Sequence, residues 1–183
     1  NSLKTVTVAV AFTAGTKAWA IGGKRASIGS TTSVKLFSNN AAAGDALPGW
    51  TVEMESGHAE TLAGGLVLRR AGDSTTGRII LRGTSGAATM PILTFSNNSA
   101  MITDNSGYKL LKDFELRNTN ATKTASIGIT ATATNNTILQ NIVQTHSTNK
   151  SWKGALISLG NRVRGCNFQN LAGIGVELSA APE

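Results

Sequence analysis

The spacing of apolar and polar residues recurs along the second half of the chain. Segments 108–119, 134–147 and 160–171 share one order, in which a polar turn is followed by an apolar position, a step of three and a step of two. A repeat of between 20 and 50 residues is typical of solenoids, propellers and other arrays. Three triplets fall in line at offsets of 27 and 25 residues: Leu111-Phe114-Leu116, Ile138-Asn141-Val143 and Val163-Cys166-Phe168.

The spacing inside each triplet predicts two strands joined by a sharp bend. A step of two residues is strand alternation, in which one side chain points inward and the next outward. A step of three breaks that alternation by one residue, and the residues at that place are Asp113, Gln140 and Gly165. Gly and Asp tolerate left-handed backbone angles, whereas Gln140 fits such a corner least well. Runs between the triplets predict strands on another wall, at 125–131, 154–160 and 173–178.

No window of the chain has a sustained helical period, so each repeat has room for strands and turns only. Stacking such repeats in parallel predicts an all-β fold, a right-handed parallel β-helix of about five to seven coils. We expect Leu111, Ile138 and Val163 to lie in one column inside it.

The upstream half fits the same scheme. In "GWTVEMESG" (49–57), Val52 and Met54 alternate with Glu53 and Glu55, and strand-like runs follow at 64–73, 77–86 and 90–95. This order resembles the opening of right-handed parallel β-helix proteins of the pectate-lyase-like superfamily, with "LPGWTVEME" as the entry and "RIILRG" as the first long strand. The resemblance covers roughly residues 47–178. It implies the architecture and says little about activity, because many functions share this scaffold.

We divide the chain into an N-terminal cap or anchoring segment, 1–46, and a parallel β-helix, 47–183. The first segment contains an alternating strand-like run at 4–12 and a candidate short helix within 33–47. A β-helix has an open end where unpaired strand edges invite pairing, so we expect this segment to cap it or to attach it to a larger assembly. The sequence given stops partway into a coil, so we expect either that the protein continues or that another chain covers that end.

Composition and charge narrow the candidate chemistry. The 183 residues carry a formal net charge of +7 but are only 15% charged and 5% aromatic. The basic residues are scattered, without the clustered aromatics of a nucleic-acid site, so we do not expect a nucleic-acid partner. There is no run of 18 apolar residues, so we expect no membrane span. Cys166 is the only cysteine, which excludes an internal disulfide, and we expect it to act as a small buried hydrophobe.

The sequence contains no convincing catalytic or metal-binding set. Glu53 with Glu55 and Asp113 with Glu115 are the close acid pairs, and solvated outer-face acids explain both. The bend positions do not form a ladder of carboxylates, and the two histidines lie far apart in sequence. We therefore predict no catalytic residues, no metal and no cofactor.

A few exposed-type residues are candidates for binding a surface glycan. Trp152 lies in the turn "NKSWKG", where Lys150 and Lys153 flank it, and its indole could stack on a sugar ring. Arg69 and Arg70 belong to the densest basic group and could attract an acidic partner.

Polar, cysteine-poor β-helices rich in Thr and Asn resemble virion components of tailed bacteriophages, such as tailspikes, tail fibres and capsid decoration proteins. The resemblance implies a non-enzymatic structural or interaction protein, located in a virion or outside the cell. It also implies a homo-oligomer, such as a trimer, or a larger virion assembly. Two alternatives stay open: a fragment of a secreted polysaccharide lyase or glycoside hydrolase on the same scaffold, and a bacterial surface adhesin or filament subunit.

Overall fold

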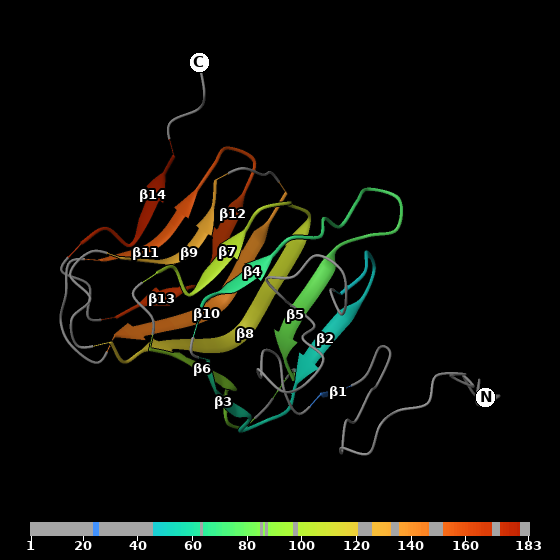
Figure 1. Cartoon of the computed structure of the whole chain (residues 1–183). Coiled ribbons are helices and arrows are strands. Elements are labelled where there is room, and N and C mark those ends of the chain that lie inside the picture. The colour runs from blue at the N-terminus through green and yellow to red at the C-terminus, as the bar shows by residue number, and fades with distance from the viewer. Residues whose placement is uncertain are drawn as a thin grey trace.

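The described part of the chain is built of strands and turns, without a helix (Figure 1). The structure is a computed structural model, and it describes residues 24–25, 46–62, 64–84, 86, 88–96, 99–120, 126–132, 136–146, 152–169 and 173–179. The expected all-β class is confirmed for these residues. The strand predicted at 4–12, the short helix predicted within 33–47 and the capping role of 1–46 lie almost entirely outside the described residues.

The strands form two sheets, and every pairing between the described strands is parallel. The first sheet has nine strands. Six of them lie in the order β1 (Lys24–Arg25), β2 (Thr51–Met54), β5 (Ile79–Gly83), β8 (Lys109–Asn118), β10 (Ile138–His146) and β12 (Arg162–Arg164). The other three strands are β3 (Ala59–Leu62), β6 (Ile92–Phe95) and β13 (Asn167–Phe168). Strand β3 pairs with β6, β6 pairs with β8, and β13 pairs with β10.

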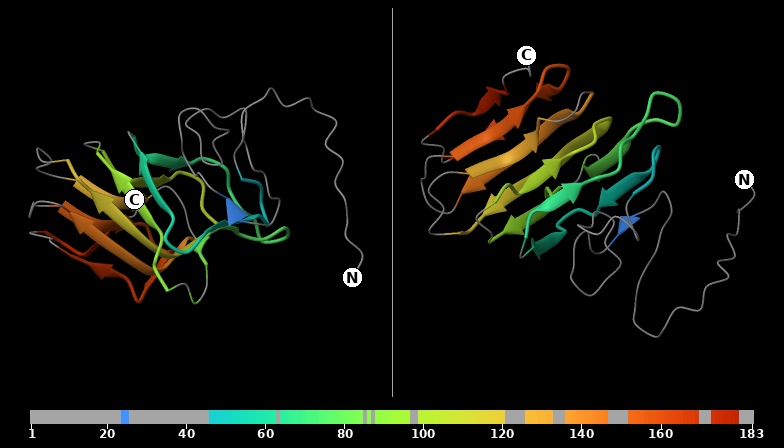
Figure 2. Two further views of the ribbon diagram at one scale, coloured as in Figure 1. Left: turned by 90° about the horizontal axis from the view of Figure 1, so that it is seen from below. Right: turned by 45° about the horizontal axis from the view of Figure 1, so that its top comes forward.

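The second sheet has five strands, which Figure 2 shows side by side. Their order is β14 (Val176–Leu178), β11 (Trp152–Ile157), β9 (Ser126–Ala131), β7 (Ile102–Asp104) and β4 (Leu66–Leu68). The predicted strands on another wall, within 125–131, 154–160 and 173–178, correspond to β9, β11 and β14, so that prediction is confirmed. Three short strands, β1, β3 and β7, were not predicted.

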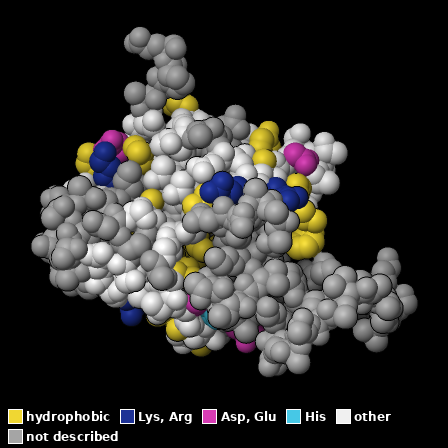
Figure 3. Space-filling view, viewed as in Figure 1, with side chains coloured by type: hydrophobic (Ala, Val, Ile, Leu, Met, Phe, Trp, Pro, Cys, Tyr) yellow, Lys and Arg dark blue, Asp and Glu magenta, His cyan; other side chains and the backbone are white. Residues whose placement is uncertain are grey.

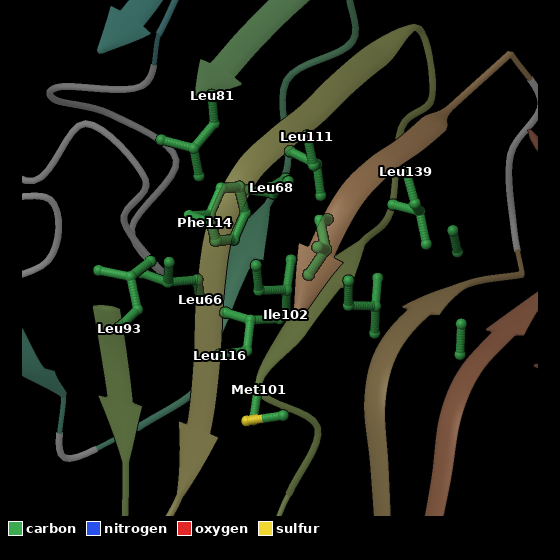
Figure 4. Packing of buried hydrophobic residues seen from close by; sticks show 14 of the residues in the cluster. Leu66, Leu68, Leu81, Leu93, Met101, Ile102, Leu111, Phe114, Leu116 and Leu139 are labelled. Carbon is green, nitrogen blue, oxygen red and sulfur yellow. The ribbon is translucent and has the colours of Figure 1, made fainter. Parts of the chain in front are cut away.

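The core lies between the sheets and follows from strand alternation. In β2, Val52 and Met54 are buried while Thr51 and Glu53 are partly exposed, as the sequence pattern predicts. In Figure 4, Leu81 and Leu111 of the first sheet lie near Leu68 of the second, among the other buried aliphatic side chains. Burying one such side chain contributes about 1.5–3 kcal/mol, so the inward rows of both sheets supply most of the stabilising free energy.

The inward rows run through successive strands in register. The longest row consists of Val52, Leu81, Leu111, Leu139 and Val163, each paired across to the next. The steps along the chain between these residues are 29, 30, 28 and 24 residues. A repeat of about this length was predicted from the triplets, although it is less regular than the offsets of 27 and 25 suggested.

The predicted row is wrong in its middle triplet. Leu111 pairs with Leu139 and not with Ile138, and Phe114 pairs with Ile142. The side chains of Ile138 and Val143 are partly exposed and that of Asn141 is exposed, so this triplet lies on the outer face. The predicted column of Leu111, Ile138 and Val163 therefore contains Leu139 in place of Ile138. Because side chains alternate along a strand, a slip of one residue moves the whole triplet to the other face. The first triplet is buried and the third packs against the core, as predicted.

Two of the three bends occur at the residue where the sequence predicted a special backbone angle. Asp113 has φ 61°, Gly165 has φ 58°, and the middle bend residue is Asn141, with φ 50°, not Gln140. Asn and Asp are the residues other than Gly that adopt this conformation most readily. The Asn141 side-chain nitrogen donates a hydrogen bond to Asp113 Oδ1 at 2.9 Å, which ties neighbouring bends together. Each of β8 and β10 therefore contains two straight halves: the first half of β8 pairs with β5 and the second with β6.

Candidate functional site

The predicted binding residues do not converge on one site. Arg69 and Arg70 are exposed and follow the carboxyl end of β4. Lys153 is near the amino end of β11 and forms an ion pair with Glu177 of β14, at 2.7 Å. Since β4 and β11 are parallel members of one sheet with β7 and β9 between them, the arginines and Lys153 lie toward opposite ends of the strands. Trp152 begins β11, but its side chain, like all of Lys150, lies outside what the structure describes.

Glu53 and Glu115, one acid from each close pair, contact neighbouring polar groups. Glu53 accepts hydrogen bonds from Arg82 on the adjacent strand, at 2.8 and 2.7 Å. Glu115 binds Arg117, at 2.8 and 3.0 Å, and accepts a hydrogen bond from Thr145 Oγ1 at 3.1 Å. The Glu53–Arg82 and Glu115–Thr145 contacts join neighbouring strands on the outer face, whereas Glu115 and Arg117 both lie on β8.

The described residues contain one polar cluster in the interior, at the start of β8. Lys109 and Asp104 are each 1% exposed, and Lys109 Nζ lies 2.7 Å from Asp104 Oδ1. The Lys109 ammonium also donates to Ser106 Oγ at 2.7 Å and to the Gly107 carbonyl at 3.1 Å. An ammonium has three N–H donors, so these three acceptors use all of them.

Asp104 is held as firmly as Lys109. Its Oδ1 accepts the backbone N–H groups of Ser106 and Gly107, at 3.0 and 3.1 Å. Its Oδ2 accepts a hydrogen bond from the Thr137 hydroxyl. Thr137 N donates to Asn161 Oδ1 at 2.9 Å, so the network continues from β7 through the residue before β10 to the residue before β12.

Burial and hydrogen bonding give this cluster a structural role. Burial lowers the pKa of Lys109 below its usual value, and the neighbouring Asp104 carboxylate opposes that shift only in part. A lysine with a lowered pKa is a common catalytic base or nucleophile. Here, however, the amine is buried, and each of its donors is already bonded within the chain. The cluster stabilises the register between strands and presents no group to a substrate.

Sequence reasoning missed this cluster, although Lys109 carries a local signal. Lys109 is two residues before Leu111 in an alternating strand, so it shares the inward face. Asp104 carries the same kind of signal, because it is two residues after the buried Ile102, but its pairing with Lys109 depends on how β7 faces β8.

The strands β12, β13 and β14 present an apolar surface to solvent. Their inward positions continue rows that are buried in the preceding strands: Ala155 and Ile157 are 0% and 5% exposed, whereas their partners Val176 and Leu178 are 39% and 61% exposed. The neighbouring Ile174 and Leu159 are 51% and 66% exposed. We call the surface made by Val163, Phe168, Ile174, Val176 and Leu178 the terminal face.

Two arginines border the terminal face. Arg162 and Arg164, both on β12, are exposed, and neither makes an ion pair with any residue that the structure describes. The Lys153–Glu177 pair on the opposite sheet adds no net charge. The described border of the terminal face is therefore positive.

Cys166 lies between β12 and β13. It is partly buried against the core, and burial raises the pKa of its thiol. A raised pKa keeps the thiol protonated at neutral pH, which agrees with the predicted role as a small hydrophobe.

No set of side chains in the described part of the chain forms a recognisable reaction centre. No group of three or more His, Cys, Asp or Glu side chains there could hold a metal ion. His58 lies 3.3 Å from Glu60, and the side chain of His146 is not described. On the face in Figure 3, Lys and Arg side chains occur in small separate groups. Within the described residues, no helix is both long and apolar enough to span a membrane.

Comparisons of this chain with protein-family models, with curated proteins and with solved structures found no match.

Proposed function

We propose that the two sheets are walls of a right-handed parallel β-helix of about five to seven coils. The order in which the chain visits the sheets supports this fold. After β2 and β3 in the first sheet, it crosses to β4 in the second, returns to β5 and β6, and crosses again to β7. The bend halves of β8 and β10 would form two walls, and the second sheet would form the third.

We infer that the protein is a non-enzymatic structural or interaction component, of the kind found in bacteriophage virions. The observation that carries this proposal is the parallel register that extends through β1, β2, β5, β8, β10 and β12. In such a stack nearly every strand is bonded on both sides, so the rod is stiff and exposes few backbone groups to proteases. The role requires the protein to act as a homotrimer or within a larger virion assembly. Glu53 and Glu115 support it too, because their carboxylates bond to residues on neighbouring strands.

Localisation tests this proposal most directly. Antibodies raised against the chain should label intact phage particles purified from an induced culture of the source organism, as seen by immunogold electron microscopy. Label confined to the cell surface would instead identify an adhesin or filament subunit.

An activity assay addresses the enzymatic alternative. The chain should release neither unsaturated products nor reducing ends from polygalacturonate, alginate or the host surface polysaccharide. Release of either product, lost on heat denaturation of the chain, would refute the non-enzymatic proposal.

A further inference from the structure

The terminal face has an unused strand edge as well as exposed apolar side chains. Strands β12 and β13 each pair with β10 and with no other described strand, and β14 pairs only with β11. The outer backbone N–H and C=O groups of these strands therefore have no strand partner within the described residues. A row of unpaired backbone groups beside apolar side chains is a template for adding another strand.

The opposite end of the stack is already covered. Its inward residues Val52, Leu66 and Leu68 are 4%, 4% and 1% exposed, and β1 pairs with the outer edge of β2. The exposed inward side chains at the β12–β14 end thus distinguish it from the β2–β4 end. A head-to-tail stack of copies would have to displace this cover.

The chain contains a template for the strand that fits the terminal face. In β2, Val52 lies beside Leu81 and Glu53 lies beside Arg82 of β5, with the Glu53 carboxylate bonded to the Arg82 guanidinium at 2.7 and 2.8 Å. Strand β12 repeats the receiving pattern, with an inward apolar residue, Val163, directly before an outward arginine, Arg164. The free edge of β12 corresponds to the other edge of β5, the one that faces β8. A parallel strand with an apolar residue followed by an acid would place these two side chains beside Val163 and Arg164 on that edge.

We propose that the terminal face binds an extended, acidic segment of another protein. This segment adds a strand at the edge of β12, with an apolar side chain over Val163 and a carboxylate beside Arg164. A second copy of this chain fits less well. Pairing two terminal faces would bring Arg162 and Arg164 of both copies together without an acid to offset them, and like charges at an interface are costly. The inference rests on the proposed interaction role and gives it a surface and a partner chemistry.

Peptide binding to the intact chain tests the proposal. The probe is a synthetic peptide with the sequence of residues 49–56, "GWTVEMES", and its matched control carries Lys at the Glu53 position. Titration is followed by backbone amide shifts of the nitrogen-15-labelled chain. The acidic peptide should shift amides of β12–β14 with a Kd of about 1 mM or tighter. It should bind about 5-fold or more tightly than the Lys peptide, because one rim ion pair is replaced by repulsion.

Charge reversal separates specific pairing from general attraction. In Arg164→Glu the preference should invert, so that the Lys peptide binds more tightly. Arg69→Glu makes the same change at an exposed arginine away from the terminal face and should leave the preference unchanged. Leu178→Asp should weaken both peptides, whereas Leu47→Asp, an exposed leucine outside the terminal face, should not.

Three outcomes would overturn the inference: no shift of β12–β14 amides at about 5 mM peptide, equal binding of the two peptides, or self-association of the chain that Leu178→Asp abolishes. The last would mean that a second copy occupies the terminal face. None of these outcomes affects the particle labelling or the polysaccharide assays, so the proposed function can survive the failure of this inference.

Discussion

Two adjacent residues of β10 provide a direct test of the register. Leu139 is 1% exposed and lies in the row between Leu111 and Val163, whereas Ile138 is partly exposed on the outer face. Leu139→Ala removes three carbons from a packed interior, and we expect it to lower the free energy of unfolding by about 3 kcal/mol. Ile138→Ala removes carbons that already contact water, so its cost should be about 1 kcal/mol or less.

The measurement is equilibrium unfolding in urea, followed by far-ultraviolet circular dichroism. With a slope near 2 kcal/mol/M, Leu139→Ala should shift the midpoint down by about 1.5 M, and Ile138→Ala by about 0.5 M or less. Each variant is the other's control, because both shorten an aliphatic side chain in the same strand. If Ile138→Ala were as destabilising as Leu139→Ala, the triplet with Ile138 inside would be right and the described register wrong.

Further predictions concern the interior and the single thiol. Gly128→Ala should lower the free energy of unfolding by about 2 kcal/mol in the same assay, because a Cβ at this position would lie 2.6 Å from the Gly154 carbonyl oxygen. Its control is Gly64→Ala, whose Cβ would meet nothing within 4 Å and should change stability by about 0.5 kcal/mol or less. Equal effects of the two variants would refute the close packing at Gly128. Because the pKa of Lys109 is lower in the folded state, the unfolded state binds more protons at this residue. The stability of the wild type relative to Lys109→Met should therefore rise as pH increases toward 10.5. Urea unfolding at several pH values measures this difference, and a fall with increasing pH would contradict the prediction. Iodoacetamide should alkylate Cys166 at pH 7.5 more slowly than it alkylates the urea-unfolded chain, as mass spectrometry can follow, and equal rates would contradict its burial.

Local alternation was enough to predict the longer strands and two of the three bends, but not the short strands β1, β3 and β7. It failed in β10 because "TILQNIVQ" contains two overlapping alternations. The predicted triplet contains Val143, an inward-type residue, whereas the observed row places Gln144 inside, fully buried. Neither side-chain atom of Gln144 has a hydrogen-bond partner in the described part of the chain. Hydrophobicity therefore does not separate the two alternations, because the observed row has the polar Gln144 inside and the predicted row has the polar Asn141 inside.

The candidate binding residues were harder to predict than the strands. Arg69 and Arg70 are exposed, as their side-chain type predicts. Whether the candidate residues lie close together depends on which strands are neighbours, and the sequence pattern does not give this. The terminal face has the same difficulty, because Val176 and Leu178 have the pattern of buried residues. Only the end of the sheet, which no local pattern specifies, leaves them exposed.

The choice between the two alternations of β10 is decided by polar contacts. With Ile138 and Val143 inside, the unsatisfied amide of Gln144 would reach water, which would stabilise the folded state by about 1–3 kcal/mol. The same slip would turn Thr137 outward and remove its hydrogen bond to buried Asp104, and a bond to a charged group contributes about 1.5–3 kcal/mol. It would also move the left-handed bend from Asn141 to Gln140, at a further cost of up to about 1–2 kcal/mol, since Gln lacks the short side chain that makes this conformation accessible. The exchange of Leu139 for Ile138 is nearly neutral, but the slip would also replace the buried Ile142 side chain with the polar Asn141 side chain. The bend, the buried Asp104 network and the burial of Ile142 together outweigh the amide and hold the observed register.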